Sequence, residues 1–363
     1  MTSVYKETLS SLKFDFFSTA GEWHDHLLED ILIAKKSIFI EIYRFRDDTV
    51  GRKFLSALSK KCKQGIDVLM IVDSWGTNVP ETFFNPIKKH GGKVIFYEKL
   101  KFTWDFIASN HERNHRKIVV IDDNISHVGS ANITEYSKNW RESIVRMEGK
   151  IAPVLKKMIL NYAHNANNQF YKQNQYKKIV KFQDFLIIQD FPSIYQQKIK
   201  SHYERIIKKA KKEVAIISPY FLPGYKLRRL LAMVAQKSIN INIYIPNHSD
   251  VKMVDYLRDK YLGVLHRSGI KIWFYNGDNL HAKILMIDGK KYVFGSSNFD
   301  YRSFRYMHEI MIQGQNQILG GFIQEFIDET QKKCSPFDYL KWKKRSQVSK
   351  IIGWILLPFR HFF

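Results

Sequence analysis

Residues 115–122 of the chain read HRKIVVID, and residues 281–288 read HAKILMID. The same three residue types follow each histidine fourteen to seventeen positions later: Gly129, Ser130 and Asn132 in the first copy, and Gly295, Ser296 and Asn298 in the second. Agreement of this length at two places 166 residues apart indicates an internal duplication. We expect each half of the chain to contribute half of one active site.

A continuous apolar run rich in β-branched residues follows each His-x-Lys, which predicts a buried strand. Side chains two positions apart lie on the same face of a strand. We therefore expect His115 and Lys117 to project together, as His281 and Lys283 do. These two histidines and two lysines are the predicted catalytic core.

Two aspartates close the repeated stretches, Asp122 in the first and Asp288 in the second. Their odd offsets from the histidines place them on the opposite face of a regular strand. We interpret them as structural from this geometry, although they belong to the repeated motif and are counted with its candidate catalytic residues.

Such a set of residues suits attack on a phosphodiester. One imidazole can take the phosphoryl group as nucleophile while the other donates a proton to the leaving oxygen. The lysines would offset charge in the transition state, because a cation there stabilises the phosphate oxygens. Further hydroxyl and amide groups are expected to support the phosphate: Ser130, Asn132, Ser296 and Asn298. The spacing offers no metal site, and no cofactor is expected.

The repeated residues resemble the HKD motifs of the phospholipase D superfamily. More of the chain is similar to the bacterial cardiolipin synthases, in particular the B type, which lacks membrane spans at the N-terminus. The similarity extends over roughly residues 28–312 and is carried, besides the motifs, by residues 40–51, 218–223, 245–250, 280–283 and 300–304.

The resemblance also implies an acidic partner for each motif histidine, nearly thirty positions after it. Glu142 lies 27 positions after His115, and Glu309 lies 28 positions after His281. A carboxylate on the second ring nitrogen fixes the tautomer and stabilises the imidazolium form. Each glutamate is therefore expected to serve the histidine of its own half.

Weaker similarity between the halves extends beyond the motifs, since residues 31–38 match 207–214 and residues 92–97 match 269–275. Each half is predicted to run helix, strand, helix, strand, strand into its motif strand and then a helix. This alternation is typical of an α/β fold with a mixed sheet. We expect two duplicated α/β sandwich halves, related by a pseudo-twofold axis around one active-site cleft. The predicted boundaries are 1–164 for the first half, 165–195 for a linker, 196–335 for the second half and 336–363 for a basic amphipathic tail.

The chain has 58 basic and 35 acidic residues, a net charge of +23, which predicts a polyanionic partner. Residues 341–363 hold six basic residues and no acidic one, and the apolar run 351–359 is too short to span a bilayer but can lie among headgroups. We expect anionic phospholipid as partner and a peripheral position on the cytoplasmic side of a bacterial membrane. The alternative is a terminal helix docked on the protein's own surface. Nucleic acid is the less favoured polyanion, no obligatory protein partner is indicated, and a chain truncated after Lys333 is expected to stay folded.

The resemblance implies a phosphatidyltransferase of the cardiolipin synthase type. His115 would take the phosphatidyl group from one phosphatidylglycerol with loss of glycerol, and a hydroxyl of a second phosphatidylglycerol would attack the phosphohistidine. His281 would act first as general acid and then as general base. The alternatives are a phospholipase D-like phosphodiesterase, either a lipid hydrolase or a nuclease, and a non-catalytic membrane-binding protein. The duplicated length and the tail disfavour a nuclease, and the intact motifs disfavour a non-catalytic protein.

Overall fold

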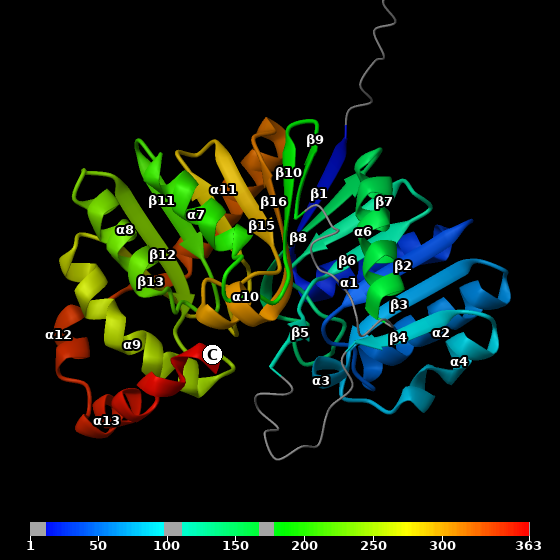
Figure 1. Cartoon of the computed structure of the whole chain (residues 1–363), viewed down its shortest axis with the longest axis horizontal. Coiled ribbons are helices and arrows are strands. Elements are labelled where there is room, and N and C mark those ends of the chain that lie inside the picture. Colours follow the sequence, from blue (N-terminus) through cyan, green and yellow to red (C-terminus); the bar gives the residue numbers. More distant parts are fainter. Residues whose placement is uncertain (1–11, 98–110, 167–177, 363) are drawn as a thin grey trace, which may run out of the picture.

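A computed structural model describes residues 12–97, 111–166 and 178–362, and it places two mixed sheets side by side with helices packed on them (Figure 1). The elements of the first half are β1 (Lys13–Thr19), α1 (Ala20–Ile33), β2 (Ser37–Ile42), α2 (Thr49–Lys63), β3 (Asp67–Asp73), α3 (Ser74–Thr77), η1 (Glu81–Phe84), α4 (Asn85–Lys89), β4 (Lys93–Tyr97), β5 (Arg113–Asn114), β6 (Ile118–Ile121), β7 (Ile125–Gly129), β8 (Arg141–Glu148) and α6 (Ile151–Ala166).

The second half repeats this plan and adds a strand at each edge. Its elements are β9 (Ile179–Phe182), β10 (Phe185–Asp190), α7 (Lys198–Lys208), β11 (Glu213–Ile217), α8 (Tyr225–Ala235), β12 (Asn240–Pro246), α9 (Lys252–Arg267), β13 (Lys271–Tyr275), β14 (Ile284–Ile287), β15 (Lys291–Gly295), α10 (Tyr301–Tyr306), β16 (Met307–Gly314), α11 (Gln317–Lys332), β17 (Cys334–Pro336), α12 (Tyr339–Lys343), α13 (Gln347–Ile355) and η3 (Leu357–Phe362).

The two sheets have the same strand order, which confirms the predicted duplication and the mixed α/β fold. The first sheet runs β1-β8-β7-β6-β2-β3-β4, and the second runs β10-β16-β15-β14-β11-β12-β13 between β9 and β17. In both, three neighbouring strands are parallel and the rest of the shared order is antiparallel. Strand β5 of the first half pairs with β16 of the second, so the halves are joined by backbone hydrogen bonds.

The motif strands β6 and β14 lie in the middle of their sheets and are covered on both faces. Ile118 and Val120 belong to a core shared by the two halves, whereas Val119 and Ile121 belong to the outer core of the first half. Burial on both faces explains why the run is apolar at every position. Each strand starts three residues after its histidine, so the expectation that His115–Lys117 forms part of the strand is wrong.

The shared core lies between the two sheets. It contains side chains of α6 and α11 together with residues of both sheets, among them Val145 and Ile310. The outer core of the first half packs α1 and α2 on its sheet, and that of the second half packs α7, α8 and α9. The halves therefore form one continuous apolar body, which holds the two motif loops in fixed positions.

Part of the predicted linker, residues 165–195, belongs to the second sheet. Strand β10 pairs with β16 and takes the place that β1 has in the first half, and β9 pairs with β10. The second half thus begins before residue 196. The composition of residues 165–178 is typical of a loop, and the predicted linker was extended from this stretch through residues 179–190, which form β9 and β10. Residues 167–177 lie outside the described residues.

The predicted tail, residues 336–363, is partly built into the second half. Phe337 is 8% exposed and belongs to the outer core, and Trp342 packs so closely on α9 that a Cβ added to Gly263 would lie 2.2 Å from its ring. Truncation after Lys333 would remove both residues and β17, so the expectation that such a chain stays folded is not supported. Exposed apolar side chains of the described tail are Leu340 on α12 and a larger group on α13 and η3, including Ile351 and Ile355. Within the described ranges, no helix combines the length and apolarity that crossing a membrane requires.

Candidate active site

The two motif histidines line one pocket of about 240 Å³ between the halves. The His115 N–H donates to the carbonyl of His308 at 3.0 Å, and the His281 N–H donates to the carbonyl of Arg141 at 2.8 Å. His308 and Arg141 stand at or near the start of equivalent strands, β16 and β8. Each motif loop is thus fixed by the other half, as the predicted pseudo-twofold arrangement requires.

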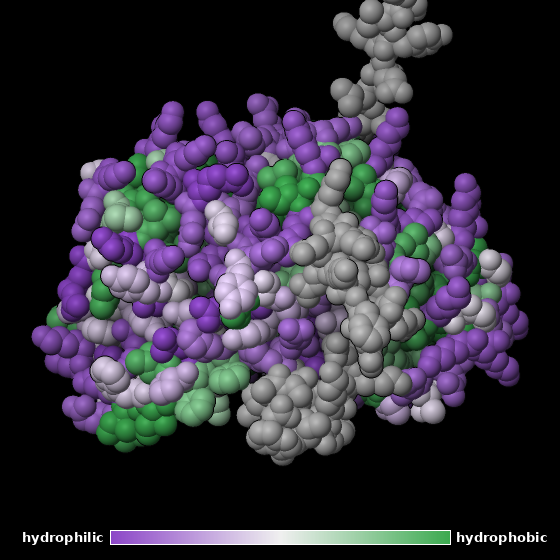
Figure 2. Space-filling model, viewed as in Figure 1, coloured by the Kyte–Doolittle hydropathy of each residue, from purple (hydrophilic) through white to green (hydrophobic). Residues whose placement is uncertain are grey.

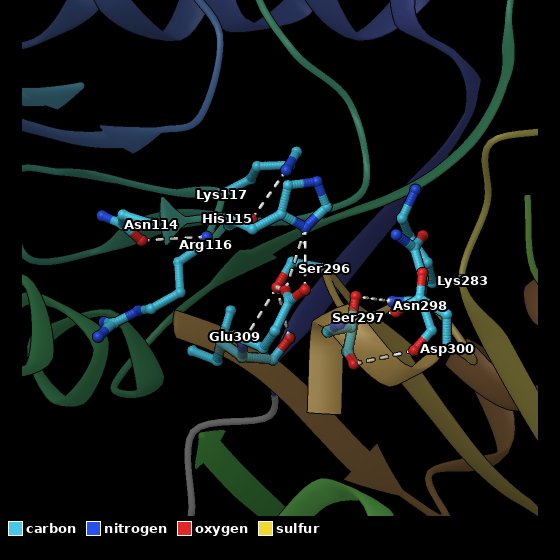
Figure 3. Close-up of polar contacts among 12 residues, drawn as sticks. Asn114, His115, Arg116, Lys117, Lys283, Ser296, Ser297, Asn298, Asp300 and Glu309 are labelled. Carbon is cyan, nitrogen blue, oxygen red and sulfur yellow. Dashed lines mark hydrogen bonds and ion pairs between the residues drawn. The ribbon is translucent and has the colours of Figure 1, made fainter. Parts of the chain in front are cut away.

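The glutamate partners are exchanged between the halves. The Nδ1 atom of His115 lies 3.0 Å from Oε1 of Glu309, and Nδ1 of His281 lies 2.8 Å from Oε1 of Glu142. Figure 3 shows the His115 ring directed at the Glu309 carboxylate. The expectation that each glutamate serves the histidine of its own half is therefore wrong. The residue just before each glutamate binds the opposite motif loop, and this brings the carboxylate to the opposite histidine.

The motif serines support the glutamates. The Ser130 hydroxyl donates to Oε2 of Glu142 at 2.5 Å, and the Ser296 hydroxyl donates to Oε2 of Glu309. Both serines are fully buried, and neither is among the residues that line the pocket. Their hydroxyls hold the carboxylates that hold the histidines, so the expected direct contact with phosphate is not what the geometry favours.

The two histidines have different electrostatic surroundings. Burial lowers the pKa of His115 well below 6.5, and the nearby charges of Lys117 and Lys283 lower it further. Burial raises the pKa of its partner Glu309 to about 7. The lowered pKa favours the neutral imidazole of His115, and the tautomer in which Nδ1 donates to Glu309 leaves the Nε2 lone pair available as a nucleophile.

His281 has a more strongly ionised partner. Burial by itself would raise the pKa of Glu142. The charge of His281 and hydrogen bonds from His281 and Ser130 outweigh burial, so the pKa of Glu142 is lowered below 4.5. Burial lowers the pKa of His281 below 6.5, and the Glu142 carboxylate offsets part of that effect, whereas at His115 the neighbouring lysines add to the lowering. An ionised partner favours the protonated imidazole, which is the form that can donate a proton.

Both motif lysines are buried behind the histidines. The ammonium of Lys117 donates to the carbonyl of His115 at 2.8 Å, and that of Lys283 donates to the carbonyl of His281 at 2.5 Å. Burial lowers the pKa of Lys117 to about 7 and that of Lys283 to about 8. Each ammonium has further donors beyond this bond, and its charge lies next to the histidines.

The asparagines reach the pocket, and the aspartates do not. Asn132 and Asn298 both line it, and Oδ1 of Asn298 has no hydrogen-bond partner among the described residues. Asp122 accepts hydrogen bonds from the backbone of residues 35–37 at 2.7–2.9 Å, and Asp288 accepts them from residues 211–213 at 2.7–3.1 Å. Each carboxylate joins the end of its motif strand to the start of the neighbouring strand, which is a structural position.

Several pocket residues were absent from the predicted site. The Tyr43 ring packs edge-on against His115 with centroids 4.9 Å apart, and the Trp140 ring lies 5.3 Å from His281. Arg302 and Asp250 line the pocket, and Asp250 accepts a 2.7 Å hydrogen bond from the Tyr220 hydroxyl. Four of the five lie within or beside segments that carry the family resemblance, whereas Trp140 had no sequence signal beyond its place two residues before Glu142.

Among the residues that the structure describes, no three His, Cys, Asp or Glu side chains gather as they would around a metal ion. The carboxylates nearest the histidines are each committed to one imidazole and one serine hydroxyl.

The chain is similar to known proteins over most of its length. The family model described as "Cardiolipin synthase, PLD-like domain" matches residues 27–170 and 203–333, one segment in each half. The chain is 30% identical over 358 residues to a cardiolipin synthase of Clostridium perfringens, which covers 93% of this chain and 74% of that protein. It is 31% identical over 309 residues to a cardiolipin synthase of Listeria welshimeri, which covers 82% of this chain and 64% of that protein.

A solved structure has the same fold. The phosphatidylserine synthase of Haemophilus influenzae superposes with a TM-score of 0.76 over 96% of this chain and 95% of its own. The two sequences are 13% identical, so this likeness concerns the fold alone.

Proposed function

The chain belongs to the cardiolipin synthase family of PLD-like proteins, and from this premise we propose that it transfers a phosphatidyl group from phosphatidylglycerol through a phosphohistidine. The observation that carries the proposal is the pair of motif histidines in one pocket, each bound through Nδ1 to a buried glutamate. Such a pair provides one nucleophile and one proton donor for displacement at phosphorus.

The first step uses the neutral imidazole of His115. Its Nε2 attacks the phosphorus of phosphatidylglycerol, a P–N bond forms, and the P–O bond to the glycerol headgroup breaks. His281 donates its Nε2 proton to the departing glycerol oxygen. Glu309 stabilises the positive charge that develops on His115, and Lys117 and Lys283 offset the charge on the phosphate oxygens.

The second step reverses the proton transfer. A primary hydroxyl of a second phosphatidylglycerol loses its proton to His281 and attacks phosphorus, and the P–N bond to His115 breaks. An alcohol must then be preferred over water. Trp75, Trp140 and Tyr220 on the pocket wall support this preference, since aromatic surface reduces the space that water can occupy.

Membrane association follows from the nature of the substrate, and the tail supports a peripheral attachment. Val348, Ile351 and Ile355 on α13 are 66%, 56% and 63% exposed, and Phe359 on η3 is 53% exposed. Apolar side chains among basic residues are suited to the headgroup layer of an anionic bilayer. We propose that the protein lies on the cytoplasmic face through this surface.

The test is to incubate purified protein with labelled phosphatidylglycerol vesicles, and separately with nucleic acid, both in the presence of a chelator. Cardiolipin and free glycerol, identified by mass spectrometry, are the expected products. Phosphatidic acid without cardiolipin would identify a lipid hydrolase, and cleaved nucleic acid with intact lipid would identify a nuclease. The His115→Ala protein is the control for contaminating activity.

A further inference from the structure

A second pocket, of about 500 Å³, lies between α8, α9 and α10 and the C-terminal segment, and it shares no lining residue with the catalytic pocket. We call it the tail pocket. Five of its lining residues are cations and none is acidic: Arg228, Lys260, Arg345, Lys350 and Arg360. Three of these come from the tail and two from the body of the second half, so the tail completes the pocket.

The cations of the tail pocket rest on aromatic rings. Arg228 lies 3.9 Å from the centroid of Tyr261, Lys260 lies 3.4 Å from that of Trp354, and Arg345 lies 4.1 Å from that of Trp342. Stacking of this kind orients a cation without neutralising it. The heads of these side chains are therefore held around the pocket with their charge intact.

Nearby carboxylates are engaged elsewhere. Asp255 and Asp259 on α9 form ion pairs with Arg258, at 3.1 Å and 3.7 Å. Among the described residues, none of the five cations forms an ion pair with a carboxylate. Burial lowers the pKa of Lys260, and the neighbouring positive charge of Arg345 lowers it further. This cluster is complementary to an anion, and the guanidinium groups suit phosphate oxygens in particular.

The surface beside the tail pocket is apolar. Helix α13 packs on α9 through Gly353, where an added Cβ would lie 3.0 Å from the Tyr256 carbonyl. Its other side exposes Val348, Ile351 and Ile355, and Figure 2 shows hydrophobic side chains at the lower left, where α13 lies in Figure 1. A ligand that fits both features carries a phosphate and long apolar chains.

We infer that the tail pocket binds the phosphate of an anionic phospholipid as a site separate from the catalytic pocket. This inference deepens the proposed function and rests on its membrane attachment. Tyr301 of α10 lines the tail pocket, and Arg302, the next residue, lines the catalytic pocket. The two pockets are therefore neighbours, and a lipid held in the tail pocket lies beside the pocket that contains His115 and His281.

The first test measures binding to vesicles with catalysis disabled by His115→Ala. Arg345→Gln with Lys350→Gln removes two charges from the tail pocket, and Lys341→Gln with Lys344→Gln removes two exposed charges from the same tail outside it. Phosphatidylcholine vesicles with and without phosphatidylglycerol serve as probes, at equal ionic strength. We expect the pocket pair to weaken binding roughly tenfold or more and the matched pair to weaken it only a few-fold. Equal losses in both pairs would overturn the site in favour of diffuse attraction.

The single variant Lys350→Gln is the control that separates loss of binding from loss of folding. The Lys350 side chain makes no hydrogen bond or ion pair among the described residues, so its replacement leaves the tail docked. A several-fold loss of binding at an unchanged Tm supports the site. Wild-type affinity for anionic vesicles in this variant and in the pocket pair, both folded, would overturn it.

The second test identifies the source of the phosphate. Short-chain phosphatidylglycerol below its micelle concentration should raise the Tm of the His115→Ala protein, and the rise should shrink in the pocket pair. Inorganic phosphate at the same concentration should raise it much less. An equal rise with both would mean a site for free phosphate and would overturn the lipid assignment. Cardiolipin formation by the wild-type protein in detergent is measured separately, so that failure of the tail pocket and failure of the proposed activity are distinguishable.

Discussion

The exchange of glutamates between the two histidines is the feature at the scale of single residues on which the chemistry depends. His115 has a partner whose pKa is raised to about 7, whereas His281 has a partner whose pKa is lowered. Equivalent positions in the duplicated chain have therefore become electrostatically unequal. This inequality supports His115 as the nucleophile and His281 as the proton donor.

Replacing either histidine should abolish turnover, and replacing His281 should trap the intermediate. We expect His115→Ala and His281→Ala each to lose activity by roughly a thousandfold or more, because the two act as one unit. With His281→Asn, labelled phosphatidylglycerol should leave acid-labile, base-stable label on His115. Peptide mapping after a rapid quench reads this out. Label on His281 in the converse His115→Asn protein would exchange the roles.

The two glutamates should affect stability with opposite dependence on pH. The folded pKa of Glu309 is raised from 4.5 to about 7, so its contribution is full below pH 4.5 and is lost as the pH rises through 7. Glu309→Gln should thus gain stability relative to wild type over this window, by up to roughly 3 kcal/mol.

The matched control is Glu142→Gln. The pKa of Glu142 is lowered, so its contribution is present above pH 4.5 and is lost as the pH falls through the folded value. This variant should be less stable than wild type at neutral pH. Urea unfolding at pH 5 and pH 8 tests both variants, and the same sign for both at pH 8 would contradict the electrostatic asymmetry.

At the scale of elements, the C-terminal segment has two parts, one that belongs to the fold and one that we propose contacts the membrane. Strand β17 pairs with β13, and α12 packs through Trp342 on α9, so this part belongs to the fold. Helix α13 touches α9 through Gly353 but exposes most of its apolar side chains. The boundary between folding and membrane contact therefore lies near Ser346, the N-cap of α13.

Two truncations should separate these duties. A chain ending at Lys333 loses Phe337 and Trp342 from the core, and we expect it to aggregate or to unfold at a much lower Tm, since loss of one large buried aromatic side chain costs about 3–5 kcal/mol. A chain ending at Arg345 should stay folded, keep its turnover on detergent-dispersed lipid and lose binding to anionic vesicles. Circular dichroism melts and vesicle sedimentation measure the outcomes. A stable chain ending at Lys333 would contradict the assignment of β17 and α12 to the fold.

At the scale of the whole molecule, the site exists only because the halves share one core and exchange backbone hydrogen bonds. Arg141 is one of the side chains that cross this boundary. Its guanidinium donates to the Thr330 hydroxyl at 2.7 Å and to the Phe326 carbonyl at 3.0 Å, and it lies over the Phe326 ring. The backbone carbonyl of Arg141 also accepts a hydrogen bond from the His281 N–H.

Arg141→Ala should therefore weaken both stability and catalysis. We expect a loss of about 2–4 kcal/mol, because a buried donor group and its packing disappear together. Activity should fall further than stability requires, since the strand that carries Glu142 is released. Arg141→Lys keeps the charge without the planar fork and should recover only part of both. Unfolding free energies within 0.5 kcal/mol of wild type for both variants would show that the boundary does not depend on this residue.

The sequence by itself determined the duplication, the two buried motif strands and the family. The duplication and the strands follow from local patterns, namely a β-branched apolar run and the same spacing in both copies, and the family follows from the resemblance of these motifs. The structural interpretation of Asp122 and Asp288 also agrees with their observed place, but for another reason. Both lie just past the end of a motif strand, at φ 53° and 55°, and accept hydrogen bonds from the backbone at the start of the neighbouring strand.

Only the tertiary structure decided which glutamate meets which histidine. The offsets of 27 and 28 residues are nearly the same in both halves, so a pseudo-twofold pair permits partners within a half or across it. Contacts between β5 and β16, and from His281 to Arg141, select the crossed arrangement. The tertiary structure likewise decided that Ser130 and Ser296 bind the glutamate carboxylates. It also decided that β9 and β10, within the predicted linker, belong to the second sheet, and that α12 packs on the core. These features depend on pairing and packing between separate elements of the fold, which a local pattern does not encode.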